Sequence, residues 1–300
     1  MSVNPDVHRP RRLPEPAAFF GLLKPVTWFP PVWAYLCGVV STGIQPESWT
    51  VTAIGLLLAG PVVCGMSQAA NDYCDRHVDA INEPNRPVPS GRVPPGWALG
   101  LALAMTVLAL VVGPALGPWG FVPTCVAVAA AWIYSVPPFR LKRDGWWGPA
   151  LVALCYEGLP WFTGAAVVMG GAPSFFVVVV ATLYALGAQG IMVLNDFKAM
   201  EGDRAMGIRS LPVVKGPDTA ARLACITMAL PQALVVALLA IWGAPVAALA
   251  IAALLIGQFA IMRVFLSDPT GRATWYSGVG VPFYVVGMMI AAFALRGMSL

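Results

Sequence analysis

Long stretches with almost no charged residues are the feature that most restricts how this chain can fold. Five such stretches occur: 25–71 and 145–195, which hold one charge each (Glu47 and Glu157), and 93–139, 223–262 and 273–295, which hold none. The chain is 58% hydrophobic and 11% charged, whereas a soluble domain carries about 25% charged residues. The sequence therefore predicts a protein that crosses a membrane several times.

The length of these stretches predicts the number of crossings. A membrane-spanning helix needs about 20 apolar residues, so the first four stretches hold two helices each and the last holds one. The ranges expected are 26–44, 50–70, 97–116, 119–136, 149–169, 174–194, 222–242, 245–265 and 277–295. Strand-type alternation is absent, and in lipid every backbone polar group must be paired internally. We expect an all-α integral membrane protein, with residues 1–300 forming one transmembrane domain of nine helices.

The basic residues predict the orientation in the membrane. With nine helices, 17 of the 18 Lys and Arg residues fall on one side, and only Arg296 falls on the other. Because cytoplasmic loops are enriched in Lys and Arg, the N-terminus should be cytoplasmic. Residues 1–18 are polar and Pro-rich without an apolar segment, which predicts a cytoplasmic tail and no cleavable signal peptide.

Two short acidic clusters follow the second and sixth predicted helices and contain six of the chain's 14 acidic residues. The first cluster consists of Asp72, Asp75 and Asp79, and the second of Asp196, Glu201 and Asp203. Each begins with an Asn-Asp-aromatic triplet, and four helices separate them, so both should open on the cytoplasmic face. The predicted active-site loops are 71–96 and 195–221. Helices 2–5 and 6–9 then form two four-helix pseudo-repeats, with helix 1 added; the alternative is a chance similarity of two loop starts.

The spacing within the clusters suggests divalent cations. If the helix continues past Asn71, the three carboxylates of the first cluster share a face at i, i+3 and i+7, an unfavourable arrangement without a cation between them. Mg²⁺ prefers hard oxygen ligands and often bridges carboxylates to phosphates. Glu201 would point elsewhere unless the helix breaks near Gly202. The clusters, if they face each other, can hold two Mg²⁺ ions on a diphosphate; scattered acids in solvated loops are the alternative.

Further polar groups accompany the clusters. Arg86 lies among prolines, which lower the entropic cost of presenting its guanidinium to a phosphate. Arg140, Lys142 and Lys198 either offset the charge of a leaving diphosphate or simply anchor the protein on the positive side. Glu157 is the only acid inside an apolar stretch, so it is a candidate for the substrate pocket.

These motifs resemble those of the UbiA-type intramembrane prenyltransferases. The first is the pattern NDxxDxxxD from Asn71 to Asp79 with NRPVPSG from Asn85 to Gly91, and the second is NDFKAMEGDR from Asn195 to Arg204. Their variants are similar to the chlorophyll synthase branch, and YEGLPWFTG from Tyr156 to Gly164 is similar to its bacteriochlorophyll synthases. One departure is Ala199, four residues before Asp203, where the superfamily often has Asp. Asp196 or Glu201 must then supply that oxygen ligand.

The resemblance implies a Mg²⁺-dependent transfer of a prenyl group from geranylgeranyl or phytyl diphosphate to the propionate of bacteriochlorophyllide a or chlorophyllide a. It implies a bacterial inner photosynthetic membrane, with the active site on the cytoplasmic side. The implied cofactor is a pair of Mg²⁺ ions that bridge the diphosphate. Their implied ligands are Asp72, Asp75, Asp79, Asp196, Glu201 and Asp203, and the five aspartates among them are the catalytic residues. The implied substrate-binding residues are Asn71, Arg86, Tyr134, Arg140, Lys142, Glu157, Asn195, Lys198 and Glu201. The ring face of Tyr73 or Tyr134 would shield an allylic cation.

Two other functions remain open at this point. A prenyltransferase of the same superfamily can use another acceptor, such as haem, a quinone precursor or homogentisate. A transporter of a phosphorylated lipid is the second alternative, although transporter sites usually lie near the bilayer midplane and these carboxylates lie at helix ends. The partners expected are the two substrates and the lipid bilayer, without nucleic acid; protein partners are left open.

Overall fold

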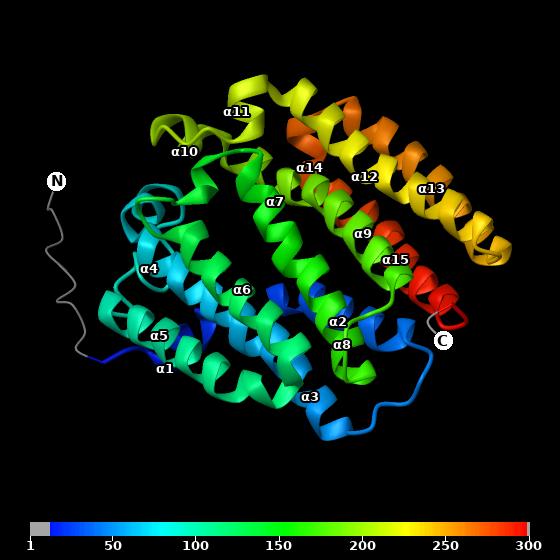
Figure 1. Cartoon of the computed structure of the whole chain (residues 1–300). Coiled ribbons are helices and arrows are strands. Elements are labelled where there is room, and N and C mark those ends of the chain that lie inside the picture. Colours follow the sequence, from blue (N-terminus) through cyan, green and yellow to red (C-terminus); the bar gives the residue numbers. More distant parts are fainter. Residues whose placement is uncertain (1–12, 299–300) are drawn as a thin grey trace, which may run out of the picture.

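The computed structural model describes residues 13–298, and this part of the chain is helical throughout apart from its connecting segments (Figure 1). The longer α-helices are α2 (Phe29–Ser41), α3 (Trp49–Leu57), α4 (Gly65–Asn82), α5 (Pro95–Val112), α6 (Gly117–Ser135), α7 (Trp147–Ala153), α8 (Leu159–Met169), α9 (Phe175–Leu194), α12 (Pro217–Ile241), α13 (Pro245–Leu266), α14 (Pro269–Val279) and α15 (Val281–Leu295). The short ones are α1 (Pro16–Gly21), α10 (Met200–Ala205) and α11 (Leu211–Lys215). Four 3₁₀ segments, η1 (Pro25–Trp28), η3 (Gly113–Leu116), η4 (Leu141–Arg143) and η6 (Asn195–Ala199), and two π-helical segments, η2 (Leu58–Cys64) and η5 (Leu154–Gly158), complete the described chain.

Each of the nine predicted ranges is helical, which confirms the all-α class. Among residues 13–298, seven continuous helical stretches are long and apolar enough to cross a membrane: Trp49–Ile81, Pro95–Ser135, Trp147–Met169, Phe175–Ala205, Pro217–Ile241, Pro245–Leu266 and Pro269–Leu295. Two differences explain why the described residues contain seven such stretches although the sequence predicts nine helices. The first predicted helix is only 13 residues long in α2, because Pro25 starts a 3₁₀ turn before it, and η3 joins α5 to α6 without a helical gap.

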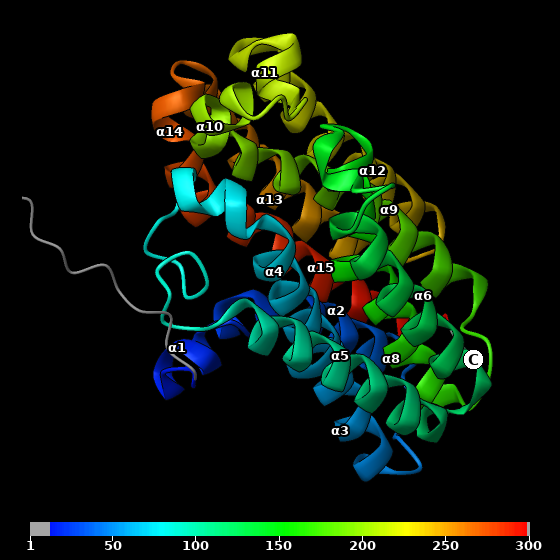
Figure 2. The same cartoon turned by 90° about the vertical axis from the view of Figure 1, so that its left-hand side faces the viewer.

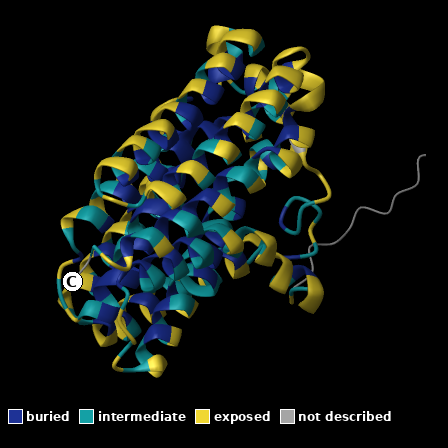
Figure 3. Cartoon of the chain, turned by 90° about the vertical axis from the view of Figure 1, so that its right-hand side faces the viewer, coloured by how far each residue is buried: buried dark blue, intermediate teal, exposed yellow. Residues whose placement is uncertain are grey.

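Buried residues lie on the inward-facing sides of the helices and exposed ones on the outer surface (Figure 3). Many of the exposed residues are large and apolar. Helices α5 and α6 lie on one side of the molecule and α12 and α13 on the other (Figure 1). Large apolar side chains on these helices are exposed, including Val111 at 71%, Val246 at 80% and Ile256 at 69%. A soluble monomer rarely exposes so continuous an apolar surface, so this belt is the surface that contacts lipid.

Two glycines allow the closest helix crossing near the centre. A Cβ atom on Gly38 of α2 would lie 2.1 Å from the carbonyl oxygen of Trp161, and one on Gly164 of α8 would lie 2.1 Å from that of Tyr35. Small residues let helix backbones approach within a membrane, where packing rather than water exclusion drives association. The α2–α8 contact therefore depends on this glycine pair, and it fixes the position of the segment before α8.

The two predicted active-site loops are more helical than expected. α4 continues to Asn82, because the polar residues after Asn71 contain no helix breaker before Pro84, so the first irregular segment is 83–94. The second segment, 195–221, contains η6, α10 and α11, and α12 already starts at Pro217. Helices α10, α11 and α14 gather at one end of the molecule, and α3 lies at the opposite end (Figure 2).

Two π-helical segments interrupt the helices that face the interior. Pro61 lies within η2, and a proline inside a helix removes one backbone hydrogen bond. η5 lies directly before α8, with Pro160 at the second position of α8. Such π segments widen a helix locally and are often found at functional sites. Both of them contribute to a cavity described below.

Candidate functional site

The first acidic cluster lies on the last turns of α4, where the uninterrupted helix places its three carboxylates on one face. Asp72 is completely buried, and the side chains of Asp75 and Asp79 are 13% and 8% exposed. Such a concentration of buried negative charge requires compensation. The structure provides it with basic side chains from three other segments.

Each carboxylate of the first cluster has its own basic partner. Lys24 Nζ lies 2.7 Å from Asp72 Oδ1, and Arg86 Nη1 lies 2.8 Å from Asp79 Oδ2 and 3.8 Å from Asp72 Oδ1. A second set of ion pairs involves Asp75, which contacts Arg140 Nη2 at 2.9 Å and also the ammonium of Lys142. In this structure, lysine and arginine side chains lie next to these like charges and offset them.

Two of these basic residues have unusual backbones. Lys24 (φ 41°) and Arg140 (φ 40°) are the only non-glycine residues with positive φ among those described. This conformation is disfavoured for residues with a Cβ atom and is often found at functional sites. Both residues use it to direct a cation at the first cluster.

The second cluster is built by a change of helix type. α9 ends at Leu194, and the chain continues as 3₁₀ helix η6 before α10 begins at Met200. This change lets Asp196, Glu201 and Asp203 face the same space, as anticipated for a broken helix. Among residues 13–298, no Lys or Arg nitrogen lies within 4.0 Å of these three carboxylates. The second cluster therefore has unneutralised acids where the first has ion pairs.

A close backbone contact joins the segment of Arg140 and Lys142 to the segment of the second cluster. Gly145 N donates to Arg209 O at 2.9 Å, and Arg209 N donates to Arg143 O at 3.0 Å. A Cβ atom on Gly145 would lie 2.3 Å from Leu211 N, so only glycine allows this approach. The contact sets the position of the second cluster relative to Lys142.

Both clusters line one cavity of about 750 Å³, which we call the acidic cavity. Its polar lining consists of Asn71, Asp75, Asp79, Glu83, Arg86, Tyr134, Lys142, Asp196, Lys198, Glu201, Asp203 and Ser210. Burial lowers the pKa of the Lys142 ammonium, and the Asp75 carboxylate offsets only part of this effect. Burial by itself would lower the pKa of the Arg86 guanidinium. The carboxylates of Asp79 and Asp72 raise this pKa by a larger amount, so the net shift is upward. Acids and bases from five segments thus meet in one space.

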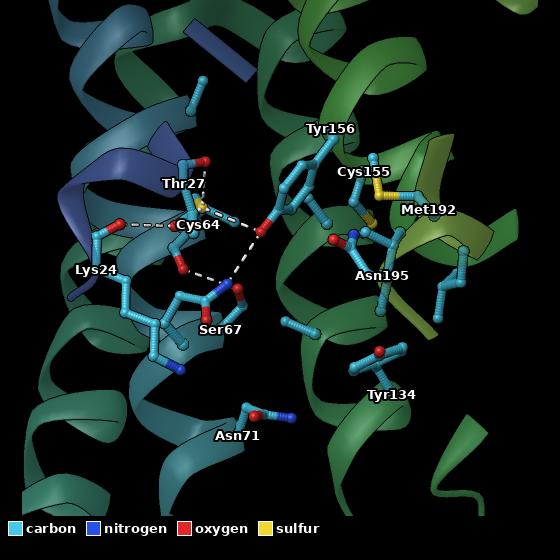
Figure 4. Close-up of a pocket in the computed structure, with 18 of the residues that line it drawn as sticks. Lys24, Thr27, Cys64, Ser67, Asn71, Tyr134, Cys155, Tyr156, Met192 and Asn195 are labelled. Atoms are coloured by element: carbon cyan, nitrogen blue, oxygen red, sulfur yellow. Dashed lines mark hydrogen bonds between the residues drawn. The ribbon is translucent and has the colours of Figure 1, made fainter. Parts of the chain in front are cut away.

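A second cavity of about 370 Å³, the inner cavity, lies between α4, α6, η5 and α9 (Figure 4). It shares Asn71, Arg86 and Tyr134 with the acidic cavity, so these residues mark the boundary between the two. Its walls are mainly apolar, with Cys64 and Cys155 from the two π segments. In Figure 4 the Tyr156 hydroxyl points across the cavity, where it accepts a hydrogen bond from Gln68 Nε2 at 3.0 Å.

Most of the predicted site residues line one of the two cavities, but three do not. Asp72 is buried beneath Lys24 and Arg86, and Arg140 contacts Asp75 from outside the lining. Glu157 lies on η5, where its neighbours Cys155 and Tyr156 line the inner cavity and its own side chain does not. The Glu157 carboxyl is buried, and its Oε2 has no hydrogen-bond partner among the described residues. Tyr134 lines both cavities, whereas Tyr73 packs against the α1–α5 side.

Sequence reasoning missed Lys24, Gln68 and Tyr156 as site residues. Lys24 is an isolated cation at the start of the first predicted helix, on the same side as the clusters, and this position was the available signal. Gln68 precedes Asn71 by one helical turn, so it lies on the same face of α4. Tyr156 carried no separate signal, because its direction depends on the π-helical segment.

The donor atoms suit a hard divalent cation, although the described residues contain no group of three His, Cys, Asp or Glu side chains close enough to hold one as they stand. Asp72 Oδ2 is buried without a hydrogen-bond partner among these residues, and the second cluster lacks basic partners. Carboxylate oxygens are the ligands that Mg²⁺ prefers. The residues present therefore fit Mg²⁺, and the acids of the second cluster are the most available of them.

Comparison with known proteins places this geometry in a family. Residues 29–286 match the model of the UbiA prenyltransferase family. The chain is 65% identical to the bacteriochlorophyll synthase 33 kDa chain of Cereibacter sphaeroides, over 100% of this chain and 99% of that protein. It is 36% identical to the chloroplastic chlorophyll synthase of Oryza sativa subsp. japonica, over 91% of this chain and 75% of that protein.

A solved structure shows the same fold at low sequence identity. The UbiA homolog from Archaeoglobus fulgidus bound to GPP and Mg²⁺ superposes with a TM-score of 0.68 at 19% identity, over 93% of this chain and 99% of that one. The helical architecture, the cavity that joins the two clusters and the full-length sequence similarity lead to one conclusion: the chain belongs to the UbiA prenyltransferase family.

Proposed function

We propose that the chain transfers a geranylgeranyl or phytyl group from its diphosphate to the propionate of bacteriochlorophyllide a. The observation that carries this proposal is the 65% identity over the whole chain to a bacteriochlorophyll synthase, in a protein whose two acidic clusters line one cavity. The similarity to a chlorophyll synthase is lower, at 36%, which favours bacteriochlorophyllide over chlorophyllide as the acceptor.

The diphosphate is proposed to bind in the acidic cavity. Mg²⁺, when bound by Asp75, Asp79, Asp196, Glu201 and Asp203, would neutralise diphosphate oxygens and stabilise the charge that develops on them. Two ions are expected, because two separate clusters of acids line the cavity. Arg86, Lys142 and Lys198 line the same cavity, so their cations can balance the remaining charge. Asp72 and Arg140 are proposed to act as positioning residues. Asp72 holds Lys24 and Arg86 in place, and Arg140 holds Asp75.

The reacting carbon then lies at the boundary marked by Asn71, Arg86 and Tyr134, where the acidic cavity meets the inner cavity. The bond between C1 of the prenyl group and the diphosphate oxygen breaks, and its electron pair leaves with the diphosphate. A propionate oxygen supplies the pair for the new ester bond. The propionate is ionised at neutral pH, since an ordinary carboxyl has a pKa of about 4, so no general base is needed. The ring of Tyr134 is the aromatic face placed to stabilise an allylic cation.

The apolar walls of the inner cavity are proposed to hold part of a substrate's hydrocarbon portion, while Gln68 and Tyr156 supply polar contacts there. The proposed membrane arrangement has nine crossings as two four-helix pseudo-repeats plus one, with the N-terminus and the acidic cavity on the cytoplasmic side of a bacterial inner membrane. The strong bias of Lys and Arg toward the end of the molecule that holds the clusters supports this orientation.

A product assay tests the proposal directly. Purified protein is given bacteriochlorophyllide a or chlorophyllide a with geranylgeranyl or phytyl diphosphate, with Mg²⁺ or with a chelator, and esters are identified by mass spectrometry. We expect Mg²⁺-dependent esters of bacteriochlorophyllide a. Haem, homogentisate and a quinone precursor serve as competing acceptors, and preferential prenylation of one of them would overturn the proposed acceptor. Movement of a prenyl diphosphate across vesicles without release of diphosphate would instead indicate a transporter.

A further inference from the structure

A groove on the lipid-facing surface lies between α12 and α13, far along the chain from the first acidic cluster and separate from both cavities. It has a volume of about 410 Å³. Ile226 and Ala229 line it from α12, and Phe259, Met262 and Leu266 line it from α13. The groove is therefore apolar along most of its length.

Two arginines occupy one end of this groove. Arg222 lies on the second turn of α12, which starts at Pro217, and Arg263 lies on the last turn of α13, which ends at Leu266. At 1.5 Å per residue, both guanidiniums leave their helices within about 10 Å of the same end. This is the end where α11 precedes α12 (Figure 1).

Neither arginine has an acidic partner in the part of the chain that the structure describes. Both are exposed, and no Asp or Glu oxygen lies within 4.0 Å of either guanidinium. Asp218, one turn before Arg222 on the same helix, does not pair with it. Two unpaired cations thus stand above an apolar groove at the end of two long apolar helices.

We propose that this groove binds one anionic phospholipid, with its phosphate between Arg222 and Arg263 and an acyl chain along the groove. Arginine binds phosphate oxygens with two parallel hydrogen bonds, and basic pockets between transmembrane helices are suited to anionic headgroups. The apolar portion below the arginines matches an acyl chain rather than a soluble phosphate. The site is separate from the prenyl diphosphate site, because none of its residues lines the acidic or the inner cavity.

Native mass spectrometry of the full chain in detergent tests this proposal. The probes are phosphatidylglycerol and phosphatidylcholine with identical acyl chains, added at the same concentrations. The test variant is Arg222→Gln with Arg263→Gln, and the matched control is Arg143→Gln with Arg272→Gln, which removes two exposed arginines outside the groove. We expect the test variant to bind phosphatidylglycerol about 30-fold more weakly, equivalent to about 1 kcal/mol for each charge. The control should bind it like the unmodified protein.

Three results would overturn the proposal. One is equal retention of phosphatidylglycerol by the test and control variants. Another is equal affinity of the unmodified protein for phosphatidylcholine and phosphatidylglycerol, which would show an apolar groove without headgroup selection. The third is a dimer of the chain that is lost in the test variant while phosphatidylglycerol binding is unchanged, which would assign the groove to a second copy. Because the arginines are exposed, the test variant should keep its thermal stability, and its prenyl transfer in detergent should match that of the control.

Discussion

Lys24 shows how much one residue at the edge of a membrane helix can contribute to a buried site. Its ammonium lies 2.7 Å from the completely buried Asp72 carboxylate, and its backbone adopts a disfavoured conformation to reach it. Removal of one partner of a fully buried ion pair costs about 3–5 kcal/mol, because a charge remains without compensation. Lys24 is 24% exposed and Arg86 lies 3.8 Å from the same carboxylate, so about 1–3 kcal/mol is expected here.

We therefore predict that Lys24→Met lowers both the thermal stability and the rate of prenyl transfer. The same change in an Asp72→Asn background should alter the thermal stability much less, since the neutral amide no longer needs the ammonium. A double-mutant cycle on melting temperatures in detergent measures this coupling. Additive effects of the two substitutions would show that the pair does not stabilise the fold.

The acids of the second cluster should behave differently from Asp72. Asp196 and Asp203 face the acidic cavity without basic partners among the described residues, so their substitution breaks no ion pair. We predict that Asp196→Asn or Asp203→Asn lowers the transfer rate at least about 100-fold, because loss of a metal ligand removes several kcal/mol of charge stabilisation. The melting temperature should stay the same or rise.

Asp218→Asn is the matched control for these variants, since Asp218 is exposed on the first turn of α12. It should leave both rate and stability unchanged. Binding of Mn²⁺, followed by electron paramagnetic resonance without substrate, gives a second readout, and the cluster variants should bind fewer ions. Full Mn²⁺ binding by Asp196→Asn and Asp203→Asn would contradict a metal role for the second cluster.

At the scale of elements, the sequence predicts the long helices well and the active-site segments less well. Apolar length alone places helices such as α9 and α13 to within one residue of the observed bounds, because lipid leaves the backbone no alternative to internal hydrogen bonds. The π-helical segments η2 and η5 carry no such signal, since they depend on tertiary packing around Pro61 and Pro160. For the same reason the direction of Glu157, one position from Tyr156, cannot be deduced from its place in an apolar stretch.

The contact around Gly145 gives a prediction at this scale. Gly145→Ala would place a Cβ atom 2.3 Å from Leu211 N, so the segments of Lys142 and Asp203 must move apart. We expect the KM for the prenyl diphosphate to rise and the rate to fall at least about tenfold, because small displacements of positioning groups are costly to catalysis. Gly96→Ala, on α5 with no atom near its Cβ position, is the matched control. Unchanged kinetics in Gly145→Ala would show that the acidic cavity does not depend on this contact.

At the scale of the whole molecule, the distribution of charge predicts an orientation in the membrane, and the fold shows which segments meet. The basic residues predict which ends of the helices are cytoplasmic, and the structure brings Asp75 and Asp203 to one cavity although 128 positions separate them in the sequence. The sequence predicts that meeting only through the even number of helices between the clusters. It cannot predict that lysine and arginine side chains neutralise one cluster and leave the other open, because Lys24, Arg86 and Arg140 come from three separate turns.

The orientation itself can be measured with single cysteines in a background in which all six native cysteines are replaced by alanine: Cys37, Cys64, Cys74, Cys125, Cys155 and Cys225. Pro84→Cys lies in the segment that follows α4, and Gly171→Cys lies between α8 and α9, so the two should face opposite sides of the membrane. We predict that a membrane-impermeant maleimide labels the cysteine at 84 in inside-out vesicles and the cysteine at 171 in right-side-out vesicles. The reverse pattern would place the acidic cavity outside the cytoplasm, away from a cytoplasmic supply of prenyl diphosphate. Labelling of both positions from one side would show that an even number of crossings separates them, instead of the odd number proposed.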